Sequence, residues 1–229
     1  YRAALALAEK SGGDAITPRL ALGRSLINQA GFAEAIELAK QVLRHGGSDD
    51  AANAELLWGS VLSIEGADLI GAAAHLSKAR ELLASRSDPV RLAQIDFEQG
   101  NVAAQLGDLP RAIELYRATI ELADHADESA VFWRILGRNN LAYHLLLQGD
   151  ASAIDHARAS LQIAQEQGAL FFQPFIYSTL GEIALANDDL DQAEKYFNEG
   201  LTLAERISNP QRIAGLTANL GLVAKARGE

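Results

Sequence analysis

The sequence predicts an all-α solenoid of antiparallel helix pairs, with a repeat of about 40 residues and about 11–12 helices in total. A small residue directly follows a larger, mostly apolar one six times along the chain, and the intervals between these sites are 36, 41, 42, 39 and 40 residues. A turn residue comes seven or eight positions after each small residue, and an alanine follows the first five turns. No alternating strand pattern of useful length competes with this helical periodicity.

Three rows of residues define the repeat, and they keep the same order in every unit. The small residues are Gly23, Gly59, Gly100, Ala142, Gly181 and Gly221. The turn residues are Gly31, Gly66, Gly107, Gly149, Asp188 and Gly228, and the alanines after the turns are Ala35, Ala72, Ala112, Ala153 and Ala193. Each unit therefore reads as a first helix, a tight turn and a second helix, with small side chains that let neighbouring helices approach closely.

The elements follow in order from apolar residues spaced three and four apart, interrupted at each turn. The predicted helices span residues 1–10, 17–30, 32–45, 49–65, 68–85, 89–106, 109–124, 128–148, 151–167, 173–187, 190–206 and 210–227. Proline supports these boundaries, because it fits the first turn of a helix and disrupts the middle. The five prolines all lie at predicted starts, four of them behind an expected capping side chain: Thr17-Pro18, Asp88-Pro89, Asp108 before Pro110, Asn209-Pro210, and Gln173-Pro174 as the fifth.

At this level of detail the repeat resembles the tetratricopeptide repeat. Residues 99–120 and 180–201 match its pattern of an apolar-glycine pair, a turn, an alanine and an aromatic residue almost throughout. The fourth repeat, 139–142, reads Asn-Asn-Leu-Ala, which is similar to the kinesin light chain version of the motif. Because the usual repeat is shorter, the array also resembles the sensor array of bacterial LuxR-type regulators related to the maltose-regulon activator. The resemblance implies a right-handed superhelical solenoid, and it does not indicate which ligand the chain binds.

We expect one repeat domain over residues 1–229. The chain opens on a second-type helix and stops after a first-type helix, so both end helices lack a partner. This organisation corresponds to about five full repeats with a half repeat at each end. We read the sequence as a fragment of a longer chain, since it begins at Tyr1 without an initiator.

Composition excludes several classes of function. The chain has no Cys, so disulfide scaffolds, thiol enzymes and cysteine-based metal sites are excluded. The formal charge of −10 and a pI of about 5.0 disfavour direct nucleic-acid binding, because no basic stripe offsets them. No run of apolar residues is long enough to cross a bilayer, and no signal peptide is evident. We expect a cytoplasmic protein without a membrane contact and without a cofactor.

Catalytic motifs are missing from the sequence. It contains no phosphate-binding loop and no nucleophile turn of the G-x-S-x-G kind. The histidines lie in separate repeats without metal-binding spacing: His45, His75, His125, His144 and His156. The acidic run over 187–191 lacks the glycine and closing glutamate of a calcium loop, and helix capping explains it better. We therefore predict a protein that is not an enzyme and holds no metal.

The candidate binding site is the face of the first helices, which lines the concave side of such arrays. Positions spaced three or four apart share a helix face. Asparagine suits a peptide groove, because one amide both donates to and accepts from a backbone. The candidate residues are Arg24, Phe97, Asn101, Asn139, Asn140, Tyr143, Phe175, Ser178, Glu182 and Asn219. Alternatively, the asparagines are solvated or tie neighbouring helices together. The phenylalanines of 171–175 either wedge helices apart or form an exposed binding spot.

The sequence thus predicts a noncatalytic regulatory repeat domain of a larger signalling or transcriptional regulator. Its partner would be a protein, a peptide or a small effector, and binding along the groove would change the curvature of the array. The alternative is an assembly scaffold that mediates self-association or complex formation with an inert groove. The sequence leaves the oligomeric state and the identity of the ligand open.

Overall fold

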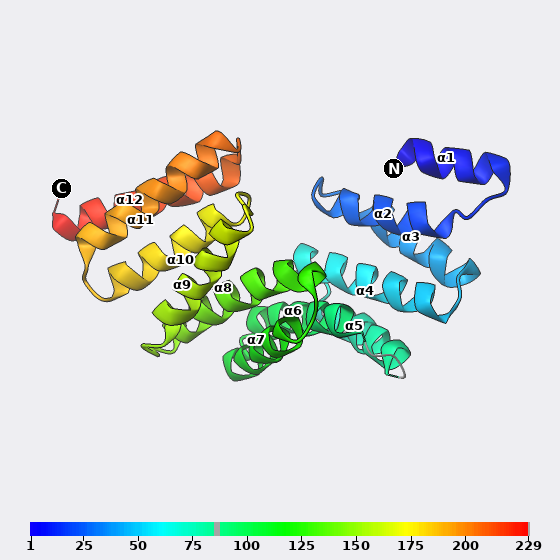
Figure 1. Cartoon of the computed structure of the whole chain (residues 1–229), viewed down its shortest axis with the longest axis horizontal. Helices are drawn as coiled ribbons and strands as arrows, with labels where there is room; N and C mark the ends of the chain where they lie inside the picture. Colours follow the sequence, from blue (N-terminus) through cyan, green and yellow to red (C-terminus); the bar gives the residue numbers. More distant parts are fainter. Residues whose placement is uncertain (85–87, 229) are drawn as a thin grey trace. The chain divides into compact units, whose positions relative to one another are not determined.

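The computed structural model describes residues 1–84 and 88–228, and in these residues the chain forms twelve α-helices, one short 3-10 helix and no strand (Figure 1). The predicted all-α fold is confirmed. The observed helix boundaries lie within three residues of the predicted ones throughout these ranges. The expected end of the fifth helix, at residue 85, falls outside the described residues.

The chain divides into two compact units. Unit 1 covers residues 1–115. It contains α1 (Arg2–Ser11), α2 (Ile16–Ile27), α3 (Phe32–His45), α4 (Ser48–Glu65), α5 (Leu69–Leu83), α6 (Pro89–Gln105) and the start of α7 (Leu109–Asp124). Two apolar clusters form its core, one between α2, α3 and α4 and the other between α4, α5 and α6.

Unit 2 covers residues 116–229. It contains the rest of α7, the 3-10 helix Glu128–Ala130, α8 (Val131–Leu147), α9 (Ala153–Glu166), α10 (Gln173–Ala186), α11 (Leu190–Arg206) and α12 (Pro210–Arg227). An apolar cluster lies between α10, α11 and α12 around the fully buried ring of Phe197.

At several repeat positions a small residue lets the paired helices approach each other closely. A β-carbon added at Gly59 would lie 2.7 Å from Leu76 of α5, and one added at Gly181 would lie 2.3 Å from Phe197 of α11. Both distances are shorter than real carbon contacts, so glycine is required there by packing. The alanines after the turns, such as Ala112 and Ala193, are completely buried.

Side-chain caps start several helices as predicted. The carboxylate of Asp88 accepts from the Arg91 N–H at 2.9 Å, and the amide oxygen of Asn209 accepts from the Arg212 N–H at 3.1 Å. The expectation for Thr17 is wrong. Thr17 lies inside the first turn of α2, and its hydroxyl donates to Asp14 at 2.8 Å. Asp14 precedes the helix, and its carboxylate accepts from the Ile16 N–H at 2.8 Å, so Asp14 takes the capping role.

First helices also contact first helices of the next repeat. In unit 1, α2 contacts α4 and α4 contacts α6; in unit 2, α10 contacts both α8 and α12. The first helices therefore form a continuous row inside each unit. This row carries every residue of the predicted binding face.

Candidate functional site

The predicted binding residues divide between the two units. Arg24, Phe97 and Asn101 lie on α2 and α6 of unit 1. The others lie on α8, α10 and α12 of unit 2: Asn139, Asn140, Tyr143, Phe175, Ser178, Glu182 and Asn219.

In unit 2 three predicted residues from two successive repeats form one hydrogen-bonded group. Ser178 and Glu182 are one helical turn apart on α10, and the Ser178 hydroxyl donates to Glu182 Oε1 at 2.9 Å. From α12, the Asn219 amide donates to Ser178 Oγ at 3.3 Å and to Glu182 Oε1 at 3.2 Å. All three residues are half-buried, so each keeps part of its surface exposed to solvent.

Arg212 joins the same surface, although sequence analysis did not select it. Its guanidinium carbon lies 4.2 Å from the centre of the Phe175 ring, in a cation–π contact. Its Nε is buried without a hydrogen-bond partner. Burial lowers the pKa of Arg212, and the nearby carboxylate of Glu182 raises it in part. The signal in the sequence was the spacing of seven between Arg212 and Asn219, which places both on one face of α12.

We call Phe175, Ser178, Glu182, Arg212 and Asn219 the α10–α12 polar cluster. A group of aromatic rings adjoins it at the start of α10. The Phe171 ring lies 5.9 Å from Phe175 and 5.4 Å from Phe172, and Phe172 lies 4.9 Å from Phe132 of α8. Phe171 is 57% exposed and Phe132 is 40% exposed. The three phenylalanines of 171–175 thus pack on one another while part of their ring surface faces solvent.

On α8 the predicted residues separate by burial. Asn139 is buried, and its Oδ1 has no hydrogen-bond partner. The backbone carbonyl of Asn140 accepts from the His144 ring at 2.7 Å. Tyr143 is 38% exposed. Tyr143 is therefore the predicted α8 residue that offers the most surface to a ligand. Asn139 is buried and offers little surface.

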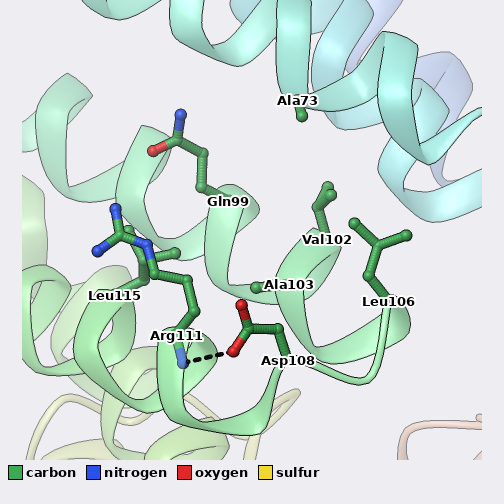
Figure 2. A pocket seen from close by; sticks show the side chains of 8 residues that line it. All are labelled: Ala73, Gln99, Val102, Ala103, Leu106, Asp108, Arg111 and Leu115. Atoms are coloured by element: carbon green, nitrogen blue, oxygen red, sulfur yellow. Dashed lines mark hydrogen bonds between the residues drawn. The ribbon is translucent and has the colours of Figure 1, made fainter.

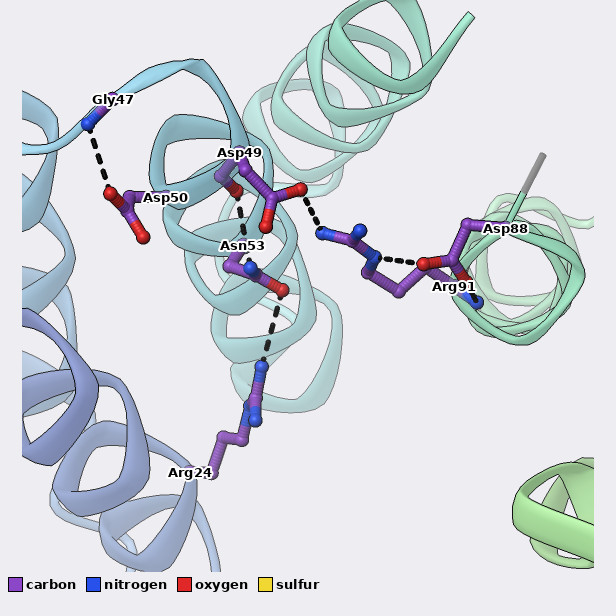
Figure 3. A network of polar contacts seen from close by, with 7 residues as sticks. All are labelled: Arg24, Gly47, Asp49, Asp50, Asn53, Asp88 and Arg91. Atoms are coloured by element: carbon purple, nitrogen blue, oxygen red, sulfur yellow. Dashed lines mark hydrogen bonds and ion pairs between the residues drawn. The ribbon is translucent and has the colours of Figure 1, made fainter. Parts of the chain in front are cut away.

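In unit 1 Arg24 belongs to a chain of polar contacts across three first helices (Figure 3). Arg24 Nη2 donates to Asn53 Oδ1 at 3.4 Å, and the Asn53 amide donates to the carbonyl of Asp49 at 3.1 Å. Arg91 donates to Asp49 at 2.7 Å and to Asp88 at 2.6 Å. Although the Arg24 side chain reaches solvent, loss of surrounding water and the charge of Arg91 lower the pKa of its guanidinium.

Farther along α6 lies a buried carboxyl group that sequence analysis did not single out. Glu98 is 7% exposed, and the Asn101 amide donates to its Oε2 at 3.3 Å. Burial raises the pKa of Glu98 to about 7, against the smaller lowering effects of Asn101 and Ser60. Phe97, beside it, is also buried and offers little surface to a ligand. Asn101 thus has a partner inside the protein.

Within residues 1–84 and 88–228 no three His, Asp or Glu side chains come together in a way that could hold a metal ion. None of the helices seen there combines the length and apolar character that crossing a membrane requires.

No protein-family model and no curated protein matches this chain in sequence. Solved structures do match its fold. BtubC (BKLC) from P. vanneervenii has a TM-score of 0.69 and 17% identity over 94% of this chain and 85% of its own. Aspartyl phosphate phosphatase F from Bacillus subtilis has a TM-score of 0.76 and 14% identity over 90% of this chain. This chain spans 54% of that phosphatase.

A third structure contains nearly identical TPR-like repeats of a candidate kinesin light chain from Podosopora anserina. It has a TM-score of 0.62 and 15% identity over 84% of this chain and 96% of its own. At these identities the likeness establishes the fold, a TPR-like stack of helix pairs. Function has to be argued from the surface residues of this chain.

Proposed function

We propose that this chain is a noncatalytic recognition domain that holds an extended peptide segment of a protein partner. The binding surface is the first-helix row of unit 2, formed by α8, α10 and α12. The observation that carries the proposal is the α10–α12 polar cluster, in which half-buried donors and acceptors from two repeats meet beside exposed aromatic rings.

The chemistry of the cluster suits a peptide backbone. Glu182 offers carboxylate oxygens to a ligand N–H, and Arg212 offers N–H groups to a ligand carbonyl or carboxylate. The exposed edges of Phe171 and Tyr143 offer apolar contact for ligand side chains. Because these groups are half-buried, hydrogen bonds formed there face less competition from water than bonds on an open surface.

The larger context remains a prediction. The three similar structures named above do not include a LuxR-type regulator by name. If the chain belongs to a larger signalling or transcriptional regulator, a peptide in the groove would favour one arrangement of the helix row over another. That change would be transmitted to flanking parts of the protein through the stacked repeats.

The test begins by panning a library of random twelve-residue peptides against the full chain. Enriched peptides are then measured by fluorescence polarisation with Glu182→Gln and Asn219→Ala. We expect Glu182→Gln to weaken binding about tenfold, because the ligand N–H loses a charged acceptor. Asn219→Ala should weaken binding less, because Asn219 acts by holding Glu182 in place through its hydrogen bond. The matched control is Thr217→Ala. Thr217 is exposed on α12, two residues from Asn219 and hence on another face, and its hydroxyl donates within its own helix at 2.8 Å.

Failure to enrich any peptide, or binding that survives both cluster substitutions, would contradict the groove as the site. Light scattering over a range of protein concentrations then tests the alternative, an assembly scaffold. Growth of oligomers with concentration, unchanged by Glu182→Gln, would favour self-association with an inert groove.

A further inference from the structure

The α10–α12 polar cluster contains two opposite charges that do not pair with each other. The carboxylate of Glu182 is held by the Ser178 hydroxyl at 2.9 Å and by the Asn219 amide at 3.2 Å. The guanidinium of Arg212 is held instead over the ring of Phe175, with 4.2 Å between its carbon and the ring centre. In the described part of the chain neither charged group forms an ion pair, although the charge of Glu182 raises the pKa of Arg212 in part.

Both charged groups keep hydrogen-bonding capacity for a ligand. The two hydrogen bonds to Glu182 end on Oε1, so Oε2 can accept from a ligand donor. Asn219 donates to α10 through its amide nitrogen, and its amide oxygen can accept beside Glu182. The Nε of Arg212 is buried without a partner, and the remaining guanidinium N–H groups are its donors. Burial lowers the pKa of Arg212, and a carboxylate supplied by a ligand would offset this cost of lost water.

The spacing of the two groups matches an extended peptide. We call Glu182 Oε2 and the Asn219 amide oxygen the acceptor subsite, and the Arg212 guanidinium the cation subsite. Phe175, which holds the cation subsite, lies three residues before Ser178 and seven before Glu182 on α10. At 1.5 Å of rise per residue the two subsites are therefore about 5 to 10 Å apart along the helix. Side chains on one face of an extended peptide are two residues apart, which is about 6.6 Å.

We propose that the α10–α12 polar cluster selects peptides in which a basic and an acidic residue stand two positions apart. The basic side chain binds at the acceptor subsite, and the acidic side chain binds at the cation subsite. This inference rests on the proposed peptide groove and adds the ligand side chains that the groove recognises.

Ligands of a single sign fit this surface less well than the pair. A peptide with only acidic residues gains Arg212 but brings its charge close to Glu182, and the formal charge of −10 on the chain adds to the repulsion. A peptide with only basic residues gains Glu182 but lies beside Arg212. Because Glu182 and Arg212 together carry no net charge, a ligand pair of opposite signs gains both attractions.

A pocket in unit 1 supplies a matched control surface. Its volume is about 240 Å³, and it lies between α5, α6 and the start of α7 (Figure 2). Its lining includes Ala73, Gln99, Asp108 and Arg111. The backbone N–H of Arg111 donates to the Asp108 carboxylate at 3.1 Å, and its guanidinium pairs with Glu114 at 2.9 Å. Arg111 thus has the same charge as Arg212 but has carboxylates of its own chain as neighbours, so Arg111→Met should leave peptide binding unchanged.

The experiment starts from the twelve-residue peptides that are enriched on the full chain. We expect these peptides to carry Lys or Arg two positions from Asp or Glu. In fluorescence polarisation, changing the acidic residue of the peptide to Asn, or the basic residue to Gln, should each weaken binding to the parent chain about tenfold. The acidic change should have little effect on binding to Arg212→Met, and the basic change little effect on binding to Glu182→Gln, because the opposite charge is already absent.

The Arg111→Met variant should respond to both peptide changes as the parent chain does. Enriched peptides that need Glu182 but lack the charge pair, or that tolerate both peptide changes, would overturn the charge selection and leave the peptide groove standing. Failure to enrich any peptide would overturn both proposals. The peptide changes measured on the parent chain are decisive even if Arg212→Met fails to fold.

Discussion

The guanidinium carbon of Arg212 lies 4.2 Å from the centre of the Phe175 ring and thereby joins α12 to α10 in unit 2. The contact places a positive charge beside Glu182, Ser178 and Asn219, where the two first helices already share hydrogen bonds. A single arginine therefore contributes both to the packing of two repeats and to the chemistry of the proposed peptide groove.

Replacing Arg212 with methionine should lower the free energy of unfolding of unit 2 by about 1 kcal/mol. The substitution keeps a long apolar stem over Phe175 but removes the cation–π attraction, which is worth about 0.5 to 1 kcal/mol when partly exposed. Urea unfolding followed through Trp133 measures this, in a chain where Trp58 is replaced by phenylalanine. Arg206→Met, an exposed change on α11, is the control, and an equal loss in both variants would contradict the contact.

Two glycines in the same repeat position should respond to alanine in opposite directions. Gly181→Ala forces a β-carbon to within 2.3 Å of the buried Phe197 ring and should cost about 1 to 3 kcal/mol. Gly221→Ala meets no atom within 4 Å and should stabilise α12 by about 0.5 to 1 kcal/mol through helix propensity. Thermal melting of the two variants checks this. A loss of stability in both would show that Gly221 is also packed.

The buried carboxyl of Glu98 should make unit 1 less stable as the pH rises through the neutral range. Below pH 4.5 the group is protonated in both the folded and the unfolded chain. Between pH 4.5 and about 7 the unfolded chain releases a proton that the folded chain keeps, so the free energy of unfolding falls. Above pH 7 the loss levels off at about 3 kcal/mol, the product of the pKa shift and 1.36 kcal/mol per unit.

Glu98→Gln isolates this effect, because glutamine has the same shape and no charge. The variant should be more stable than the parent at pH 8 and should lack this part of the pH dependence. Urea unfolding at pH 5 and pH 8, followed through Trp58 with Trp133 replaced by phenylalanine, compares the two. Glu114→Gln, an exposed change in the same unit, is the control. Parallel pH profiles for the parent and Glu98→Gln would show that Glu98 is solvated.

Neighbouring positions on α7 should differ sharply in their tolerance of leucine. Ala112 is completely buried, so Ala112→Leu should overpack the helix pair and cost about 1 to 3 kcal/mol. Arg111 is exposed, so Arg111→Leu should be nearly neutral for stability. Circular dichroism during thermal melting compares both variants with the parent, and similar melting temperatures for the two would contradict the assigned register.

The candidate site was only partly predictable. The helix-face spacing selected Phe175, Ser178, Glu182 and Asn219, and the structure brings these residues together. The same spacing could not separate buried positions such as Asn139 from exposed ones, because burial depends on the side chains of the helices on either side. Arg212 was missed because its role depends on the ring of Phe175, which lies 37 positions away in the chain.

The repeat itself was determined by the sequence alone. Small residues, turns and buried alanines recur in one register, and each acts over a few neighbouring residues, so local rules suffice to predict the helices and their pairing. Tertiary structure decided which exceptions to the repeat matter. Gln99 and Ala73 are 26 positions apart, and only the packing of α6 on α5 brings both into the lining of one pocket. Contacts between distant residues depend on how helices pack, and a helical period in the sequence carries no such information.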